Sequence, residues 1–300
     1  MTQIGVDMGG TKCAGILFDA NQQVLAETSA PTPVGGDAVI DTIVQVIDTL
    51  LAKSDGSVDV IGVGVPGLVT SGGSLRYAPH LFGVVEVKLQ QLLELRIGQT
   101  VNVMNDNTAA AWAEHRVGSG VGFSDMVYVG LGTGIGGAVV ANGRLIEGRH
   151  GFAGEIGHMT IDRNGEFCVC GRRGCWELYA SGSGLARLAG RSGETVTEAG
   201  RAGDPRALDV LRRFAADVAV GLADLINVFD PGCIVIGGGV LDPPEPLLGL
   251  IADAVASCMG DASSHRALPE VRAAALGRRA GAYGAALLGS LYSRNVRRNV

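Results

Sequence analysis

The segment Ile4-Gly5-Val6-Asp7-Met8-Gly9-Gly10-Thr11-Lys12 decides the fold. It begins with an apolar run, passes through two adjacent glycines, and continues from Cys13 to Asp19 as a second apolar run. We predict a buried strand, a tight glycine turn and a second strand. Because a P-loop and a dinucleotide-binding fingerprint both lead into a helix, this order excludes those two nucleotide-binding loops.

The glycine turn has the residue types of a phosphate-binding loop. Gly9 and Gly10 leave backbone N–H groups accessible, and Thr11 and Lys12 add a hydroxyl and a cation that suit phosphate oxygens. A tight hairpin that binds no ligand is an equally good interpretation of this turn by itself. The rest of the chain has to decide between the two.

The same order recurs between residues 125 and 141. Asp125 to Leu131 is a predicted strand, Gly132-Thr133-Gly134 a turn, and Ile135 to Ala141 a returning strand, with an Asn142-Gly143 hairpin turn after it. Two such segments about one domain apart suggest a duplicated fold in which each half supplies one phosphate loop. The recurrence favours a ligand-binding role for both turns.

Length and composition bound the class of protein. The 300 residues suit two domains or one duplicated fold, and 47% hydrophobic with 18% charged residues allows a large core. The 24 basic and 30 acidic residues give a net charge of −6, so we expect no nucleic-acid partner. Residues 1–12 carry no signal-peptide pattern, and glycines interrupt the longest uncharged run, residues 126–143. We expect a soluble, cytoplasmic protein without a membrane segment.

Polar residues follow a predicted strand at a place where α/β proteins bind ligands. The elements predicted before this point are a helix over residues 36–53, a strand over 58–65 ending at Pro66-Gly67, a polar loop at 77–81 with an amphipathic segment to about Leu95, and a strand over 101–104. Asn105-Asp106-Asn107-Thr108 then precedes a helix predicted over 109–116. Because ligands bind at the carboxyl ends of such strands, Asp106 is a candidate catalytic carboxylate. Helix capping is the alternative role for these four residues, although one cap would be enough.

A cluster of zinc-binding residue types lies between Glu155 and Glu177. It contains one imidazole and three thiols, with two glycines that let the loop fold back: His158, Cys168, Cys170 and Cys175, with Gly171 and Gly174. Four such ligands form a closed tetrahedral site, which is typical of structural zinc. A disulfide or inert buried thiols are the alternatives, but the expected reducing compartment and the glycine-rich, charged setting favour the metal. Such a site would fix the two flanking carboxylates relative to each other.

The second half of the chain adds further helices, strands and one more glycine loop. The predicted elements are a helical and then irregular stretch over 181–203, a long helix over 204–229, strands over 233–236 and 271–275, and a closing helix over 281–292. Gly237-Gly238-Gly239 could let the backbone lie against a base or ribose, and a flexible turn is the equally good alternative. Cys13, Cys233 and Cys258 sit in apolar runs, where we expect packing roles.

These motifs resemble, over nearly the whole chain, the ROK family of sugar kinases, and its bacterial glucokinases most closely. The matching residues are Asp7 to Lys12, Asn105-Asp106, Gly132-Thr133-Gly134, Glu155 to His158, Cys168 to Glu177 with its three cysteines, and Gly237-Gly238-Gly239. The cysteine motif is the most specific of them. The resemblance implies an α/β protein with the actin-like (ribonuclease H-like) ATPase fold, and two domains with ATP and Mg²⁺ in the interdomain cleft. It also implies zinc on the four clustered ligands and a homodimer or homotetramer.

Two domains follow from the resemblance. We place a small N-terminal α/β domain at residues 1–116, with the C-terminal helix at about 281–300 packing on it. A larger α/β domain at residues 117–280 would carry the zinc cluster and nucleotide-binding loops.

The implied activity is transfer of the γ-phosphoryl group of ATP to the 6-hydroxyl of a hexose, with glucose favoured. A sugar hydroxyl is a poor nucleophile, so a carboxylate must accept its proton, and we predict that Asp106 is this general base. The predicted sugar-binding residues are Gly67, Asn105, Asp106, Glu155, His158 and Glu177. The predicted nucleotide and Mg²⁺ contacts are Asp7, Gly9, Gly10, Thr11, Lys12, Gly132, Thr133, Gly134, Gly238 and Gly239.

One departure from the glucokinase pattern leaves the substrate open. Many glucokinases of the family have Asn at the position of His80, and Gly83-Val84-Val85 lacks the usual aromatic residue. Mannose, N-acetylmannosamine, fructose or allose are therefore alternative substrates, and polyphosphate is an alternative donor. The alternative function that is not enzymatic is a catalytically silent sugar sensor. A ROK repressor would need a helix-turn-helix ahead of the first strand, which we expect to begin at about Gln3.

Overall fold

The computed structural model describes residues 2–78, 81 and 85–298, and the chain forms two compact units. Unit 1 comprises Met1–Glu114, Glu147–Ala153 and Arg278–Val300, and unit 2 comprises His115–Ile146 and Gly154–Gly277. The domain boundary after residue 116 stays a prediction. The packing adds the short segment Glu147–Ala153 to the first unit.

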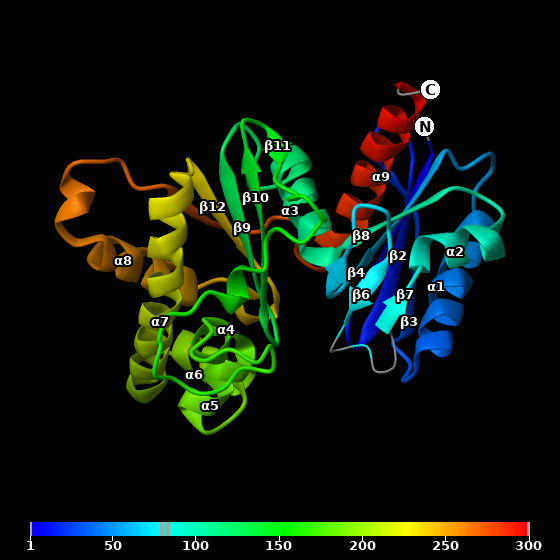
Figure 1. Ribbon diagram of the computed structural model, residues 1–300. Coiled ribbons are helices and arrows are strands. Elements are labelled where there is room, and N and C mark those ends of the chain that lie inside the picture. The colour runs from blue at the N-terminus through cyan, green and yellow to red at the C-terminus, as the bar shows by residue number, and fades with distance from the viewer. Residues whose placement is uncertain (1, 79–80, 82–84, 299–300) are drawn as a thin grey trace. The chain divides into compact units, whose positions relative to one another are not determined.

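Unit 1 is built on a five-stranded sheet in the order β3-β2-β1-β4-β8 (Figure 1). The first three strands form an antiparallel meander, and β4 and β8 continue the sheet parallel to β1. The strands are β1 (Gln3–Met8), β2 (Lys12–Phe18), β3 (Val24–Pro31), β4 (Val60–Val65) and β8 (Val101–Asn105), and the helices are α1 (Gly36–Leu51), α2 (Leu89–Ile97) and α9 (Ala280–Arg298).

A small second sheet in unit 1 was not predicted. It contains β5 (Leu68–Val69), β6 (Leu75–Tyr77) and β7 (Val85–Val87). The sequence predicted no element over residues 68–76, and β7 lies in the stretch predicted as an amphipathic segment. These strands are two or three residues long, so they offer too few positions for a period-two pattern to be recognised.

The C-terminal helix α9 packs on the central strands of unit 1 because both have a glycine beneath it. A Cβ on Gly5 would lie 1.8 Å from the carbonyl oxygen of Ala282, and a Cβ on Gly62 would lie 1.9 Å from that of Ala285. No larger side chain fits at either position. The alternate residues of β1, including Ile4 and Val6, belong to the core formed with α1. One sheet therefore carries a helix on each face.

Unit 2 repeats this arrangement with a sheet in the order β11-β10-β9-β12-β13. Its strands are β9 (Met126–Leu131), β10 (Ile135–Ala141), β11 (Arg144–Leu145), β12 (Cys233–Gly237) and β13 (Glu270–Ala273). As in unit 1, an antiparallel meander is continued by two parallel strands. The duplication predicted from the two strand–turn–strand segments is confirmed in the strand order.

The helices of unit 2 include two that the sequence did not predict. They are α4 (Glu177–Ala180), α5 (Gly182–Ala189), α6 (Gly193–Arg201), α7 (Pro205–Phe229) and α8 (Leu247–Met259), of which α4 and α8 were not predicted. The helix α3 (Asp106–Val117) begins in unit 1 and ends in unit 2. Cys258 of α8 is exposed, so its predicted packing role is wrong, whereas Cys13 and Cys233 are buried as predicted. Within the described residues, the helices are too short or too polar to cross a bilayer.

The prediction of an irregular stretch before residue 203 is wrong, because α6 forms there. Its sequence, GETVTEAGR, combines glycines and β-branched residues of low helix propensity. Two contacts compensate. The Ser192 side chain accepts a hydrogen bond from the Thr195 N–H and so caps the helix, and Gly200 leaves room for Leu211 of α7. Packing rather than propensity holds this helix.

Candidate active site and metal centre

The loop between β1 and β2 is held by Thr32, which directly follows β3. The Gly9 N–H donates to the Lys12 carbonyl at 2.9 Å and closes the turn. The Thr32 hydroxyl donates to the Gly9 carbonyl at 2.7 Å, and its N–H donates to the Thr11 carbonyl at 3.1 Å. Because a trans peptide group directs its N–H opposite to its carbonyl, the Gly10 N–H points away from Thr32. The loop thus directs this N–H to its other side, as a phosphate loop requires.

The loop between β9 and β10 is held in the same way by the start of α5. The Gly182 N–H donates to the Gly132 carbonyl at 2.7 Å, and the Ser183 hydroxyl donates to the Thr133 carbonyl at 2.8 Å. The N–H groups of Thr133 and Gly134 consequently point away from α5. In each of the two loops, an element from elsewhere in the chain therefore orients the backbone N–H groups: Thr32 in the first loop and the start of α5 in the second.

The third glycine loop lies against the second. Gly238 has a φ of 93°, and a Cβ on it would lie 2.3 Å from the carbonyl oxygen of Leu131, the last residue of β9. A Cβ on Gly239 would meet nothing within 4 Å. The structure brings the predicted nucleotide residues of unit 2 together, with open space beside Gly239.

We expect Thr32→Val to raise the KM for ATP by about 3- to 10-fold, because one hydrogen bond that orients the loop is lost. Valine preserves the size of the side chain and the backbone N–H. Steady-state kinetics with each substrate varied in turn measures the effect, and the KM for sugar should change little. Thr32→Ser, which retains the hydroxyl, is the matched control. Equal KM values for ATP in the two variants would contradict this role of Thr32.

Asp7, at the carboxyl end of β1, is enclosed by the C-terminal helix. A Cβ on Gly281 of α9 would lie 2.5 Å from the Asp7 Cγ, so only glycine leaves room for the carboxyl group. Burial raises the pKa of Asp7 from 3.8 to about 7, and the negative charge of Asp106 acts in the same direction. The two carboxyl groups are therefore electrostatically coupled.

We expect Asp7→Asn to make the protein more stable above pH 7. Between pH 3.8 and about 7 the unfolded chain has lost the Asp7 proton while the folded chain retains it, so stability falls as the pH rises through this window. The total loss is a few kcal/mol, and asparagine avoids it. Melting temperatures from pH 4 to pH 8, without added Mg²⁺ or nucleotide, measure the difference. Asp55→Asn, on the exposed loop after α1, is the control. Parallel pH profiles for wild type and Asp7→Asn would contradict the prediction.

Asn105 and Asp106 have different roles at the junction of β8 and α3. The Asn105 Oδ1 accepts a hydrogen bond from the Thr108 N–H at 3.0 Å, which is a helix cap, and its Nδ2 donates to the Gly67 carbonyl at 3.1 Å. The Asp106 Oδ1 instead accepts hydrogen bonds from the backbone N–H and side-chain amide of Asn107, at 2.8 and 3.0 Å. The capping alternative thus applies to Asn105. Gly67, Asn105 and Asp106 lie together in unit 1.

A cavity of about 260 Å³ opens beside Asn105 within unit 1. Its polar lining includes Thr70, Ser71, Gln90, Asn105, Thr108 and Glu147. Hydroxyl, amide and carboxylate groups from several elements therefore face one space. This lining suits a small polar molecule.

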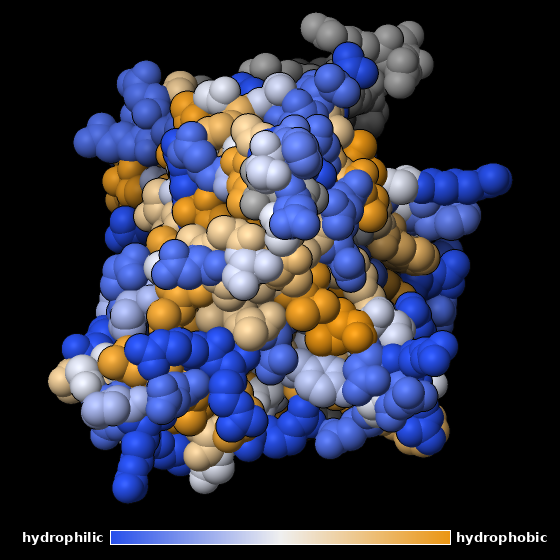
Figure 2. All heavy atoms as spheres, turned by 90° about the vertical axis from the view of Figure 1, so that its left-hand side faces the viewer, coloured by the Kyte–Doolittle hydropathy of each residue, from blue (hydrophilic) through white to orange (hydrophobic). Residues whose placement is uncertain are grey.

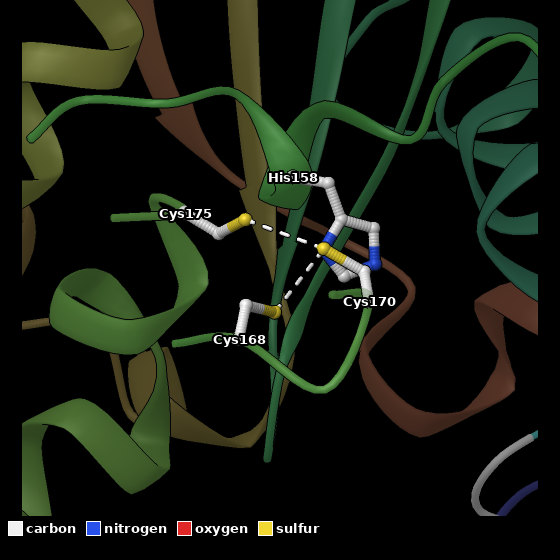
Figure 3. Close-up of side chains that lie close together, drawn as sticks. All are labelled: His158, Cys168, Cys170 and Cys175. Carbon is white, nitrogen blue, oxygen red and sulfur yellow. Dashed lines mark hydrogen bonds between the residues drawn. The ribbon is translucent and has the colours of Figure 1, made fainter. Parts of the chain in front are cut away.

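The four predicted zinc ligands converge in unit 2 (Figure 3). Their candidate ligand atoms all lie within 4.8 Å of one another, with 3.5 Å between Sγ of Cys170 and Cys175, and 3.7 Å between Cys168 Sγ and His158 Nδ1. Zn–S bonds of about 2.3 Å place tetrahedral sulfur ligands roughly 3.8 Å apart, so the donor set fits a structural zinc ion. The cysteines are free thiols, and burial raises the pKa of Cys168 to about 12. Zinc binding would therefore release protons.

The fold of the cysteine loop depends on glycine and on Trp176. Gly171 and Gly174 have φ values of 85° and 62°, which supports the prediction that they let the loop turn back. Trp176 is fully buried, donates its indole N–H to the Asp217 carbonyl at 3.0 Å, and lies over Gly221 of α7, where a Cβ would be 2.2 Å from the ring. This contact anchors the loop to the core of unit 2.

Two carboxylates lie beside the cluster on different sides of His158. The Glu177 Oε1 is 3.4 Å from His158 Nδ1 and 3.3 Å from Cys168 Sγ. The Glu155 Oε2 is 3.9 Å from His158 Nε2. The ring nitrogen that faces the sulfur atoms is therefore Nδ1, while Nε2 faces Glu155. The three predicted sugar-binding residues of unit 2 thus lie together at the ligand cluster, with His158 between the two carboxylates.

Comparison with known proteins decides the family. The ROK family model matches residues 3–290. The chain belongs to the ROK family. The glucokinase of Streptomyces coelicolor is 34% identical over 94% of this chain and 96% of that protein. The N-acetylmannosamine kinase of Escherichia coli is 36% identical over 80% of this chain and 84% of that one.

A solved structure of the family is also similar over nearly the whole chain. A ROK family glucokinase from Streptomyces griseus, in complex with glucose and AMPPNP, is 35% identical, with 97% of this chain and 100% of that chain covered and a TM-score of 0.88. The predicted actin-like ATPase fold of two domains is confirmed for this ROK protein.

The structure adds positioning residues that the motifs of this ROK protein did not reveal. Thr32, Ser183 and Trp176 contact the predicted site residues or anchor their loop, and Thr32 and Ser183 lie outside the recognised motifs. A hydroxyl side chain directly after a predicted strand is only a weak sequence signal for the positioning role of Thr32. No sequence signal indicates the positioning role of Ser183. His80, Gly83 and Val84, on which the substrate alternatives rest, lie outside the described residues.

Proposed function

We propose that the protein is an ATP-dependent hexokinase that transfers the γ-phosphoryl group of ATP to the 6-hydroxyl of glucose. The observation that carries this proposal is the 35% identity, over 97% of the chain, with a ROK family glucokinase solved with glucose and AMPPNP. Membership of the family and the convergent metal-ligand cluster agree with it. The protein is then an enzyme of the sugar kinase class.

In this reaction Asp106 accepts the proton of the attacking hydroxyl. A carboxylate is a suitable general base because it lets the hydroxyl oxygen attack the γ-phosphorus in line. Support comes from its position at the carboxyl end of β8, where it does not serve as the helix cap. Gly67, Asn105, Glu155, His158 and Glu177 bind the sugar hydroxyls, because amide, carboxylate and imidazole groups donate and accept hydrogen bonds in defined directions.

The nucleotide is bound by the three glycine loops. The backbone N–H groups directed by Thr32 and by the start of α5 hold the phosphates, together with Thr11 and Lys12. Gly238 and Gly239 lie against the base or ribose. Mg²⁺ would neutralise phosphate charge when bound, and Asp7 would help to hold it through water. His158, Cys168, Cys170 and Cys175 would hold zinc as a structural ion.

A second sugar is a specific alternative. The N-acetylmannosamine kinase of Escherichia coli is 36% identical over 80% of this chain, slightly above the identity with the Streptomyces coelicolor glucokinase. N-acetylmannosamine therefore belongs in any substrate test. The longer alignment favours glucose.

An assay that measures the sugar phosphate formed from glucose, mannose, N-acetylmannosamine, fructose or allose, with ATP or polyphosphate as donor, tests the proposal. We expect the highest kcat/KM with glucose and ATP. A higher value for another hexose would correct the substrate. Sugar binding measured by calorimetry without turnover of any sugar would instead support a sensor.

Self-association stays a prediction from the resemblance. Figure 2 shows hydrophobic residues between hydrophilic ones on the face that carries α7 and α8. On α7, Val228 and Phe229 are 71% and 40% exposed. We expect a homodimer or homotetramer in sedimentation velocity, and a monomer at every concentration would contradict this.

A further inference from the structure

Gly134, in the second phosphate loop, lies directly against the carboxylate of Glu177. A Cβ on Gly134 would be 2.8 Å from the Glu177 Oε2 and 3.9 Å from its Cδ, and these are its nearest atoms. The backbone at Gly134 is not in the left-handed region, since it is absent from the positive-φ glycines. The backbone therefore accepts alanine, and the space is restricted by Glu177 alone.

The Glu177 carboxylate is enclosed from two sides. Its Oε1 lies 3.3 Å from Cys168 Sγ and 3.4 Å from His158 Nδ1, while its Oε2 faces Gly134. Its side chain is only 17% exposed and begins at the first residue of α4. A methyl group at position 134 could not push this carboxylate toward the cysteines and imidazole without disturbing them. The Glu177 side chain would have to rotate and carry its carboxylate away from this position.

We propose that Gly134 is a positioning residue for the sugar site: its missing side chain leaves the space that holds the Glu177 carboxylate in place. This assignment rests on the proposed function, in which Glu177 binds sugar hydroxyls. It differs from the phosphate-loop role predicted for Gly134, because a phosphate contact uses the backbone N–H, which alanine retains. Because Gly134 has no Cβ, the predicted sugar-binding residue Glu177 can lie directly against the predicted phosphate loop.

Gly134→Ala adds a methyl group at the contact, and Gly249→Ala, in α8 of unit 2, is the control. A Cβ on Gly249 would have only the Glu245 Oε2 near it, at 3.4 Å, so the control adds a methyl group without a clash and outside the predicted site residues. For Gly134→Ala we expect the KM for sugar to rise about 10-fold or more, the effect of losing one hydrogen bond to a charged group. The KM for ATP should change little in Gly134→Ala. A rise in the KM for ATP with an unchanged KM for sugar would overturn the proposal.

A double-mutant cycle with Glu177→Ala isolates the contact. Because Glu177→Ala removes the carboxylate, adding Gly134→Ala should then have almost no further effect on the KM for sugar. An equal effect of Gly134→Ala in both backgrounds would overturn the proposal, since it would show that the methyl group acts elsewhere.

A crystal structure of Gly134→Ala gives a readout that does not depend on activity. We expect the Glu177 carboxylate to be displaced from its position beside Cys168 and His158. An unmoved carboxylate would overturn the proposal whatever the kinetics. If the wild-type protein phosphorylates no sugar, the proposed function fails, and the crystal structure still decides whether Gly134 positions Glu177.

Discussion

Asp106→Asn is expected to lower kcat by about 10²- to 10⁴-fold while the KM for sugar stays within a few-fold, because the general base is lost and the shape of the side chain is kept. Asparagine can still accept the hydrogen bond from the Asn107 N–H that Asp106 Oδ1 accepts, so α3 should begin at the same residue. Asp106→Ala should show a similar loss of turnover. Near-normal turnover in either variant would refute the assignment of the base.

Asn107→Ala is the control for damage at the start of α3. It removes the side-chain amide that donates to Asp106 Oδ1 at 3.0 Å but leaves the carboxylate, so its effect on kcat should be far smaller.

The pH dependence of stability gives a second test of Asp106→Asn. Since the Asp106 charge raises the pKa of Asp7, Asp106→Asn should lower that pKa and weaken the dependence of stability on pH.

Cys170→Ser is expected to abolish zinc binding, lower the melting temperature by about 10 °C and raise the KM for sugar. Serine is a poor zinc ligand, and a structural zinc site contributes directly to folding free energy. Cys170 is exposed, unlike the buried Cys168 and Cys175, so serine at this position costs little in packing. Sugar affinity should fall because His158 belongs to this cluster and Glu177 lies against it. Zinc analysis, melting curves and kinetics measure the three effects.

Cys258→Ser is the matched control for the zinc experiment. Cys258 is also exposed and also in unit 2, but it lies in α8 and is not part of the ligand cluster. Zinc content and the KM for sugar should stay at the wild-type values. If Cys170→Ser loses zinc but keeps its KM for sugar, the metal stabilises the loop and has no part in shaping the sugar site.

Features with a strong local pattern could be predicted, and features that depend on packing could not. Residues 204–229 show an apolar face with helical period, and α7 forms there with Asp204 as its cap. The stretch that becomes α6 has low helix propensity, and only its contact with α7 makes it a helix. The ligand cluster was predictable because its residue types are rare and close together in sequence, and because zinc requires them to converge.

The sequence by itself determined the duplicated strand–turn–strand plan, the family and the set of candidate zinc ligands. Each is encoded in residue types and short spacings, which fix backbone geometry over a few residues. Only the tertiary structure decided that Thr32 orients the loop between β1 and β2 and that Gly134 leaves space for Glu177. These partners lie 23 and 43 positions apart in the chain, and nothing in either residue type specifies the other. Their contact arises from the path of the folded backbone, which brings a carbonyl to a hydroxyl and a glycine to a carboxylate.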